Sequence, residues 1–133
     1  KTVYVKEGGE RCFAIVDAAM NDLMRPALYE AHHGIIPVRE APKDVEFGLV
    51  DVVGPVCETG DTFARQRALP PGVSGDLLAI QSAGAYGSSM ASMYNTRPLV
   101  PEVLVNGDKF SVVRTRPSYE DMLKPEQFAD WQR

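Results

Sequence analysis

The chain reads VPEVLVNGDKFSVVR at residues 100–114, with two apolar runs on either side of an Asn-Gly dipeptide. Asn106 and Gly107 tolerate the positive φ angles of a type I′ turn, whose twist matches that of two antiparallel strands. The pattern therefore predicts a β-hairpin made of Val100–Val105 and Lys109–Arg114. Short strands joined by tight turns are the feature on which the fold class depends.

The remainder of the chain contains further strand patterns bounded by turn residues. Thr2–Val5 and Cys12–Val16 flank Glu7-Gly8-Gly9-Glu10 and predict a second hairpin. Three apolar runs of strand length predict further sheet members: Gly34–Val38, Val45–Val53 and Asp76–Gln81. Several short strands and few long helical periods are typical of an all-β barrel or sandwich with short helices. We expect this fold class in one domain of residues 1–133.

Three segments predict helical turns or short helices. Ala18–Ala31 contains helix formers, but its central proline disfavours a continuous helix, so we expect a loop with short helical turns. Gly60–Leu69 predicts a short amphipathic helix with Asp61 as its N-cap. Ser118 and Asp121 have the spacing of a capping box and predict a short helix near the end of the chain.

Composition limits the function classes. The 133 residues carry 14 basic and 18 acidic side chains with no basic stripe, which argues against a nucleic-acid partner. No apolar run approaches the roughly 20 residues of a membrane span and no signal segment opens the chain, so we expect a cytoplasmic protein. Cys12 and Cys57 lack ligand-like spacing and His32 and His33 are adjacent, so we predict free thiols and no metal. The chain starts directly in a strand pattern, as if cut from something longer.

A thiol and a carboxylate lie side by side in GPVCETGD, residues 54–61. Held in a turn bounded by Gly and Pro, Cys57 can give or take a proton while Glu58 binds a cation. The alternative is a small buried hydrophobe, which is the commoner fate of a free cysteine. This loop is a candidate wall of an active site.

Two other stretches contain candidate binding residues. Tyr86 lies in AGAYG, residues 83–87, where small neighbours let a ligand approach the backbone; its alternative role is an aromatic plug over the core. Arg25 lies in the otherwise apolar segment Met24–Tyr29, where a guanidinium suits a bidentate grip on a carboxylate; its alternative is a solvated surface charge.

These stretches together resemble one known family. DAAMNDLMRPALY at residues 17–29, followed by GPVCETGD and AGAYG in that order, is similar to the C-terminal domain of diaminopimelate decarboxylase. The resemblance runs through nearly the whole chain, including Met90–Arg97 and Pro101–Val105. Ala19 and Thr59 depart from the family's frequent glycine and serine, and neither is a proposed chemical group.

The resemblance implies a pyridoxal-phosphate enzyme of the alanine-racemase-like fold type. An N-terminal α/β (TIM) barrel would hold the cofactor, and this β domain would complete the site across a homodimer interface. By resemblance, Cys57 is the proton donor and Glu58 receives the distal ammonium of an amino-acid substrate. Arg25 and Tyr29 bind the substrate's distal carboxylate end, and Tyr86 contacts both cofactor and substrate.

The five lysines all lie next to glycine, proline, charged residues or the terminus, unlike the desolvated lysine that a Schiff base needs. We therefore expect the chain to be inactive alone. Two alternatives stay open: the same domain of an ornithine, arginine or carboxynorspermidine decarboxylase, and a free-standing dimerisation module without catalysis. Without its barrel, we expect the chain to expose an apolar patch and to self-associate.

Overall fold

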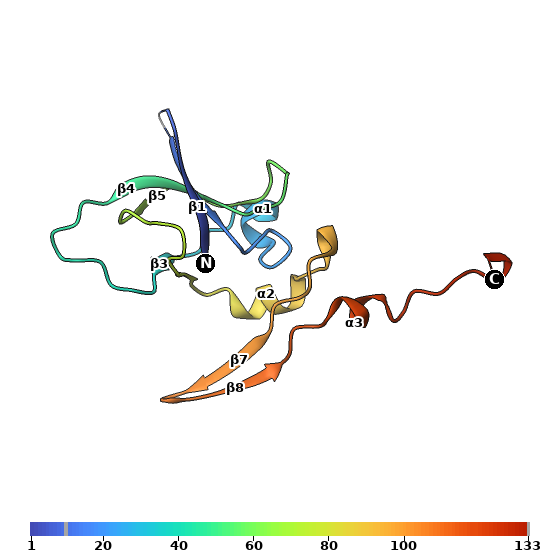
Figure 1. Cartoon of the computed structure of the whole chain (residues 1–133). Helices are drawn as coiled ribbons and strands as arrows, with labels where there is room; N and C mark the ends of the chain where they lie inside the picture. Colours follow the sequence, from blue (N-terminus) through green and yellow to red (C-terminus); the bar gives the residue numbers. More distant parts are fainter. Residues whose placement is uncertain (10, 133) are drawn as a thin grey trace. The chain divides into compact units, whose positions relative to one another are not determined.

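The computed structural model describes residues 1–9 and 11–132, and its contacts divide the chain into two compact units. Unit 1 spans Lys1–Ala91 and unit 2 spans Ser92–Arg133 (Figure 1). The single domain expected from the sequence stays a prediction. Glu10, a member of the predicted first turn, lies outside the described residues.

The main sheet of unit 1 has four strands in the order β1-β2-β4-β5. These strands are β1 (Thr2–Gly8), β2 (Arg11–Val16), β4 (Gly48–Val53) and β5 (Thr62–Leu69). β1 and β2 form the predicted hairpin and β4 pairs antiparallel with β5, whereas β2 and β4 run parallel. The parallel pair is possible because a long connection, residues 17–47, returns the chain to the same end of the sheet.

A smaller sheet pairs β3 (Ile35–Pro37) with β6 (Leu78–Ile80), which confirms strands within two of the predicted runs. Apolar side chains from both sheets meet in one core, and their removal from water stabilises unit 1. Val52, at the centre of the main sheet, is 1% exposed. The core residues are Val16, Leu23, Ile35, Val52, Phe63, Ala64 and Leu69.

The helix predicted for Gly60–Leu69 is wrong, because this segment forms β5. Its residues pair along β4 from Gly48 opposite Leu69 to Val53 opposite Thr62. Backbone pairing with β4 outweighs the moderate helix propensity of the segment. Asp61 is also not an N-cap; it is buried and binds backbone amides of two other segments.

β5 contains a bulge whose conformation depends on the buried carboxylate of Asp51. The register between β4 and β5 shifts around Asp51, and Gln66 adopts the left-handed φ of 48°. Asp51 Oδ1 accepts a hydrogen bond of 2.7 Å from the backbone amide of Gln66, and Oδ2 pairs with the guanidinium of Arg11. The carboxylate of Asp51, which is 3% exposed, thus supplies a hydrogen-bond acceptor for a backbone amide in the bulge of β5.

Two short helices complete unit 1. α1 (Arg25–Tyr29) has Pro26 in its first turn, where the missing amide costs nothing, and it confirms the predicted helical turns in Ala18–Ala31. α2 (Gly84–Met90) carries Tyr86 in its first turn.

Unit 2 contains the hairpin of β7 (Glu102–Asn106) and β8 (Lys109–Arg114), as predicted, followed by α3 (Tyr119–Leu123). The turn differs from the type I′ prediction: Asn106 pairs with Lys109, so Gly107 and Asp108 are its central residues. Only Gly107 of these two has a positive φ, 62°, and a type I′ turn requires both. Two 3₁₀ turns lie before and after these elements, η1 (Tyr94–Thr96) and η2 (Asp130–Gln132).

Four apolar side chains share one face of the β7–β8 hairpin. Val103 pairs with Val112 and Val105 with Phe110, and residues paired across antiparallel strands point to the same side. These four side chains, named here the apolar hairpin face, are 50% to 76% exposed. An exposed apolar patch was expected from the sequence.

The structure confirms a sheet-dominated domain with short helices. In the described residues the main sheet ends at β1 on one side and β5 on the other, so it is not closed into a barrel. No helix among those residues has the length and apolar character needed to cross a bilayer.

Candidate functional site

The loop that carries Cys57 and Glu58 connects β4 to β5, and both side chains are exposed. Asp61, at the end of the loop, is 2% exposed. Its Oδ2 accepts a hydrogen bond of 2.8 Å from the Val56 amide, and its Oδ1 accepts one of 2.7 Å from the Met20 amide. The loop therefore presents its thiol to solvent, while Asp61 anchors the end of the loop inside unit 1.

Gly54 makes room for this carboxylate. A Cβ atom built on Gly54 would overlap the carboxylate group of Asp61. The Gly54 amide also donates to the Asp61 carbonyl at 2.9 Å, and the Asp61 amide donates to the Glu58 carbonyl at 3.0 Å. The glycine that opens the motif and the aspartate that ends it thus form one structural unit.

Arg25 and Tyr86 are in direct contact. The guanidinium carbon of Arg25 lies 4.7 Å from the centre of the Tyr86 ring, which places a cation over a π face. Arg25 is half-buried at the start of α1, and Tyr86 is 55% exposed on α2. Stacking restricts the guanidinium while its N–H groups stay able to bind an anion.

The elements that carry these residues meet at the turn of residues 19–23, named here the 19–23 turn. The turn is closed by a 2.8 Å hydrogen bond from the Ala19 amide to Asp22 Oδ2, and Leu23 belongs to the core. Met20 ties the turn to the Cys57 loop through Asp61. A Cβ atom on Gly87 of α2 would lie 3.7 Å from the Asp22 carbonyl oxygen, so α2 packs closely on the turn.

The structure thus joins four of the five predicted site residues to one turn. Arg25 follows the turn directly, Cys57 and Glu58 reach it through Asp61, and Tyr86 reaches it through α2. Tyr29, the fifth, is exposed at the last residue of α1.

The prediction of Asp61 as a helix N-cap was wrong, because its carboxylate binds the amides of Met20 and Val56 instead. The signal that could have corrected it is the pairing of a glycine at position 54 with an acid at 61 around one loop, but the buried contact between them is visible only in three dimensions.

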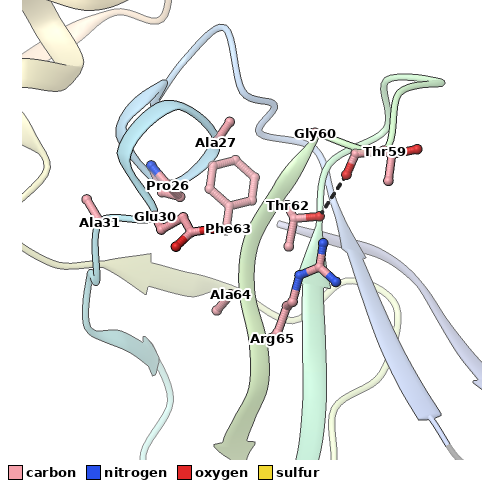
Figure 2. Close-up of a pocket in the computed structure, with 10 residues that line it drawn as sticks. All are labelled: Pro26, Ala27, Glu30, Ala31, Thr59, Gly60, Thr62, Phe63, Ala64 and Arg65. Carbon is pink, nitrogen blue, oxygen red and sulfur yellow. Dashed lines mark hydrogen bonds between the residues drawn. The ribbon is translucent and has the colours of Figure 1, made fainter.

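Two open cavities border this loop and β5, and Thr59, Thr62 and Arg65 line both. The larger, about 420 Å³, lies between α1 and β5; Figure 2 shows the Phe63 ring pointing toward Pro26 and Ala27, with Thr62 and Arg65 on the other side of the strand. The smaller, about 290 Å³, includes Glu58 among its lining residues. Cys57, Arg25 and Tyr86 line neither, so these hollows alone do not define the candidate site.

The described residues include side chains that could touch a cofactor, but no lysine suited to bind one covalently. All five lysines are exposed, whereas a Schiff-base lysine works in a desolvated pocket. The exposed phenol of Tyr86, held beside Arg25, can contact a cofactor supplied from outside the chain. Within residues 1–9 and 11–132, no cluster of three His, Cys, Asp or Glu side chains is arranged to hold a metal ion.

Comparisons with known proteins agree with this picture. Residues 1–84 match the family model described as pyridoxal-dependent decarboxylase, C-terminal sheet domain. The diaminopimelate decarboxylase of Zymomonas mobilis is 50% identical over 131 residues, which is 98% of this chain and 30% of that protein. The crystal structure of diaminopimelate decarboxylase from Helicobacter pylori complexed with L-lysine superposes with a TM-score of 0.84 at 45% identity, over 93% of this chain and 30% of that one.

A more distant structure shares the fold alone. The arginine decarboxylase of Paramecium bursaria Chlorella virus, bound to agmatine, has a TM-score of 0.66 at 18% identity over 71% of this chain and 26% of its own. The chain spans about 30% of the length of the relatives it matches. By the family match and by these identities, the chain belongs to the pyridoxal-dependent decarboxylases, in the region of their C-terminal sheet domain.

Proposed function

We propose that this chain works as the C-terminal sheet domain of a two-domain, pyridoxal-phosphate-dependent diaminopimelate decarboxylase. The reaction removes CO2 from meso-2,6-diaminopimelate and yields L-lysine. The observation that carries the proposal is the gathering of an exposed thiol, an exposed carboxylate and a ring-stacked guanidinium around the 19–23 turn. The 50% identity to a diaminopimelate decarboxylase over almost the whole chain supports the choice of substrate.

Cys57 is the proton donor in this proposal. When bound, pyridoxal phosphate stabilises the electron density left on the carbon that loses CO2, which is chemistry that the cofactor itself supplies. The protein must then deliver one proton to one face of that carbon. The Cys57 thiol is exposed on a loop whose backbone is held in place by Asp61. It can therefore reach into a pocket completed by another part of the protein and act as that acid.

Arg25, Tyr29 and Glu58 select the substrate. Diaminopimelate carries a second amino-acid end, and a site with one cation and one anion distinguishes this end from that of a plain diamine precursor. Arg25 grips the distal carboxylate, Tyr29 hydrogen-bonds at the same end, and Glu58 receives the distal ammonium.

In this proposal an N-terminal barrel supplies the residue that binds the cofactor covalently and the rest of the active site. Tyr86 contacts cofactor and substrate, while the Schiff-base lysine belongs to an N-terminal barrel. Such a barrel fits within the 70% of the relatives' length that this chain does not match. In this proposal the loop of Cys57 enters the site of the second copy in a homodimer, and the chain is inactive without its barrel.

A chimera tests the proposal. We expect this chain, joined to the N-terminal part of the Zymomonas mobilis relative in place of that protein's own sheet domain, to release CO2 and form lysine from diaminopimelate. Cys57→Ala is expected to lower kcat on the order of 10²-fold without unfolding the protein, since general acids contribute 10²–10⁴-fold. Cys12→Ala, on β2, is the control and is expected to leave kcat unchanged. An inactive chimera, beside an active relative, would contradict the proposal, and an unchanged rate in Cys57→Ala would remove Cys57 from it.

Substrate choice is tested with Arg25→Ala. We expect kcat/KM for diaminopimelate to fall on the order of 10²-fold, because a charge-assisted bidentate pair is lost. Arg65→Ala, an exposed arginine of β5, is the matched control. Equal turnover of ornithine or arginine by the wild-type protein, with no dependence on Arg25, would favour the alternative decarboxylases.

A further inference from the structure

The carboxylate of Asp61 joins two parts of the candidate site that are far apart in the sequence. One oxygen binds the amide of Val56, the residue before Cys57, and the other binds the amide of Met20, in the turn that leads into Arg25. A single side chain therefore fixes backbone beside the proposed proton donor and backbone in the turn that precedes the proposed carboxylate-binding arginine.

This tie is rigid for physical reasons. Hydrogen bonds from amides to a carboxylate are charge-assisted, and at 2% exposure Asp61 has little water to replace them. The loop backbone closes on the same residue, because Gly54 donates to the Asp61 carbonyl and the Asp61 amide donates to the Glu58 carbonyl. Movement of the carboxylate would move the loop that carries the thiol.

We propose that Asp61 is a positioning residue that sets where Cys57 delivers its proton; this inference rests on the proposed function. Asp61 acts through the backbone of the loop. Arg25 keeps a second support, because it stacks on Tyr86 at 4.7 Å. Loss of the Asp61 tie therefore affects the chemical step more than substrate binding.

Asp61→Asn in the two-domain protein is the first test. Asparagine keeps the shape but turns an NH2 group toward one of the two amide donors, so one hydrogen bond is lost. We expect kcat to fall about 10- to 100-fold, since small misplacements of reacting groups cost this much, with KM changed by less than about threefold.

The control is Asp51→Asn, on strand β4. Asp51 is equally buried and also binds a backbone amide, that of Gln66. We expect it to lower the melting temperature about as much as Asp61→Asn and to leave kcat within about twofold of wild type. Equal losses of kcat in both variants would show that Asp61 is merely structural and would overturn the inference.

Gly54→Ala decides the matter if Asp61→Asn does not fold, and it keeps the charge of Asp61. Its methyl group displaces the carboxylate, so we expect the same fall in kcat and a several-fold change in the rate at which iodoacetamide alkylates Cys57, with Cys12 as the internal reference. An unchanged alkylation ratio together with an unchanged kcat would refute the positioning role. If the wild-type protein does not decarboxylate diaminopimelate, the proposed function fails, and the alkylation ratio still reports whether Asp61 controls the Cys57 loop.

Discussion

Phe63 is a core side chain that packs from β5 toward α1, the helix that carries Arg25 (Figure 2). We expect Phe63→Ala to lower the free energy of unfolding by about 3–5 kcal/mol, because the lost apolar contact is joined by the cost of a cavity. Urea unfolding of the purified protein measures the change. Phe110→Ala removes the same ring from a 76% exposed position and should stay within about 0.5 kcal/mol of wild type. Similar losses in the two variants would contradict the assignment of Phe63 to the core.

Single residues of the site could be read from the sequence to different degrees. Cys57 and Glu58 stand out because turn residues surround them, and the structure places them on an exposed loop. Arg25 and Tyr86 were separate candidates, and only the fold reveals that one stacks on the other. The role of Asp61 could not be predicted, because one of the amides that it binds, that of Met20, is 41 residues away in the sequence.

Among the elements, α3 has a cap whose strength depends on pH. Hydrogen bonds from Lys124, and then from the Ser118 amide and hydroxyl, lower the pKa of Asp121 from its ordinary 3.8 to about 2. A lowered pKa in the folded state means that the charged carboxylate stabilises the helix above pH 4, and this stabilisation is lost as the pH falls to about 2.

We expect the amide NMR signals of Ser118 and Asp121 to shift with a midpoint near pH 2. Lys124→Gln removes the largest cause of the lowered pKa and should move the midpoint toward the ordinary value of 3.8. A wild-type midpoint already near that value would show that the capping box does not persist in solution.

Elements marked by strong turn chemistry were predictable, whereas those decided by tertiary pairing were not. The hairpins at both ends of the chain and the Ser118 capping box depend on local residues and were confirmed. β5 was mistaken for a helix because its residues allow both forms, and the presence of β4 beside it decides between them. The centre of the β7–β8 turn lies one residue later than predicted. The strand register, rather than the Asn-Gly pair, sets its position.

At the scale of the whole molecule, the apolar hairpin face predicts association. We expect the isolated chain to form dimers or larger species with rising concentration, since four large apolar side chains face water on one side of the hairpin. Light scattering or sedimentation detects this. Phe110→Lys should shift the protein toward the monomer, while Leu104→Lys, on the opposite face, should not. A chain that stays monomeric at all concentrations, or equal effects of the two variants, would exclude this face as the contact.

Most of the overall architecture followed from composition and pattern, because alternating apolar runs and turn residues are local properties. Whether the main sheet closes into a barrel did not follow from the sequence. It depends on which strands lie at the edges, and the described residues leave β1 and β5 as its ends.

The left-handed residue in β5 has a consequence for the behaviour of concentrated solutions. Among the described residues, β5 is eight residues long and lies at the edge of its sheet, where its outer backbone groups form a template on which another molecule could add a strand. The bulge at Gln66, held by Asp51, bends that template out of register with a regular strand. The buried carboxylate of Asp51 thereby disfavours regular strand pairing between molecules at this edge.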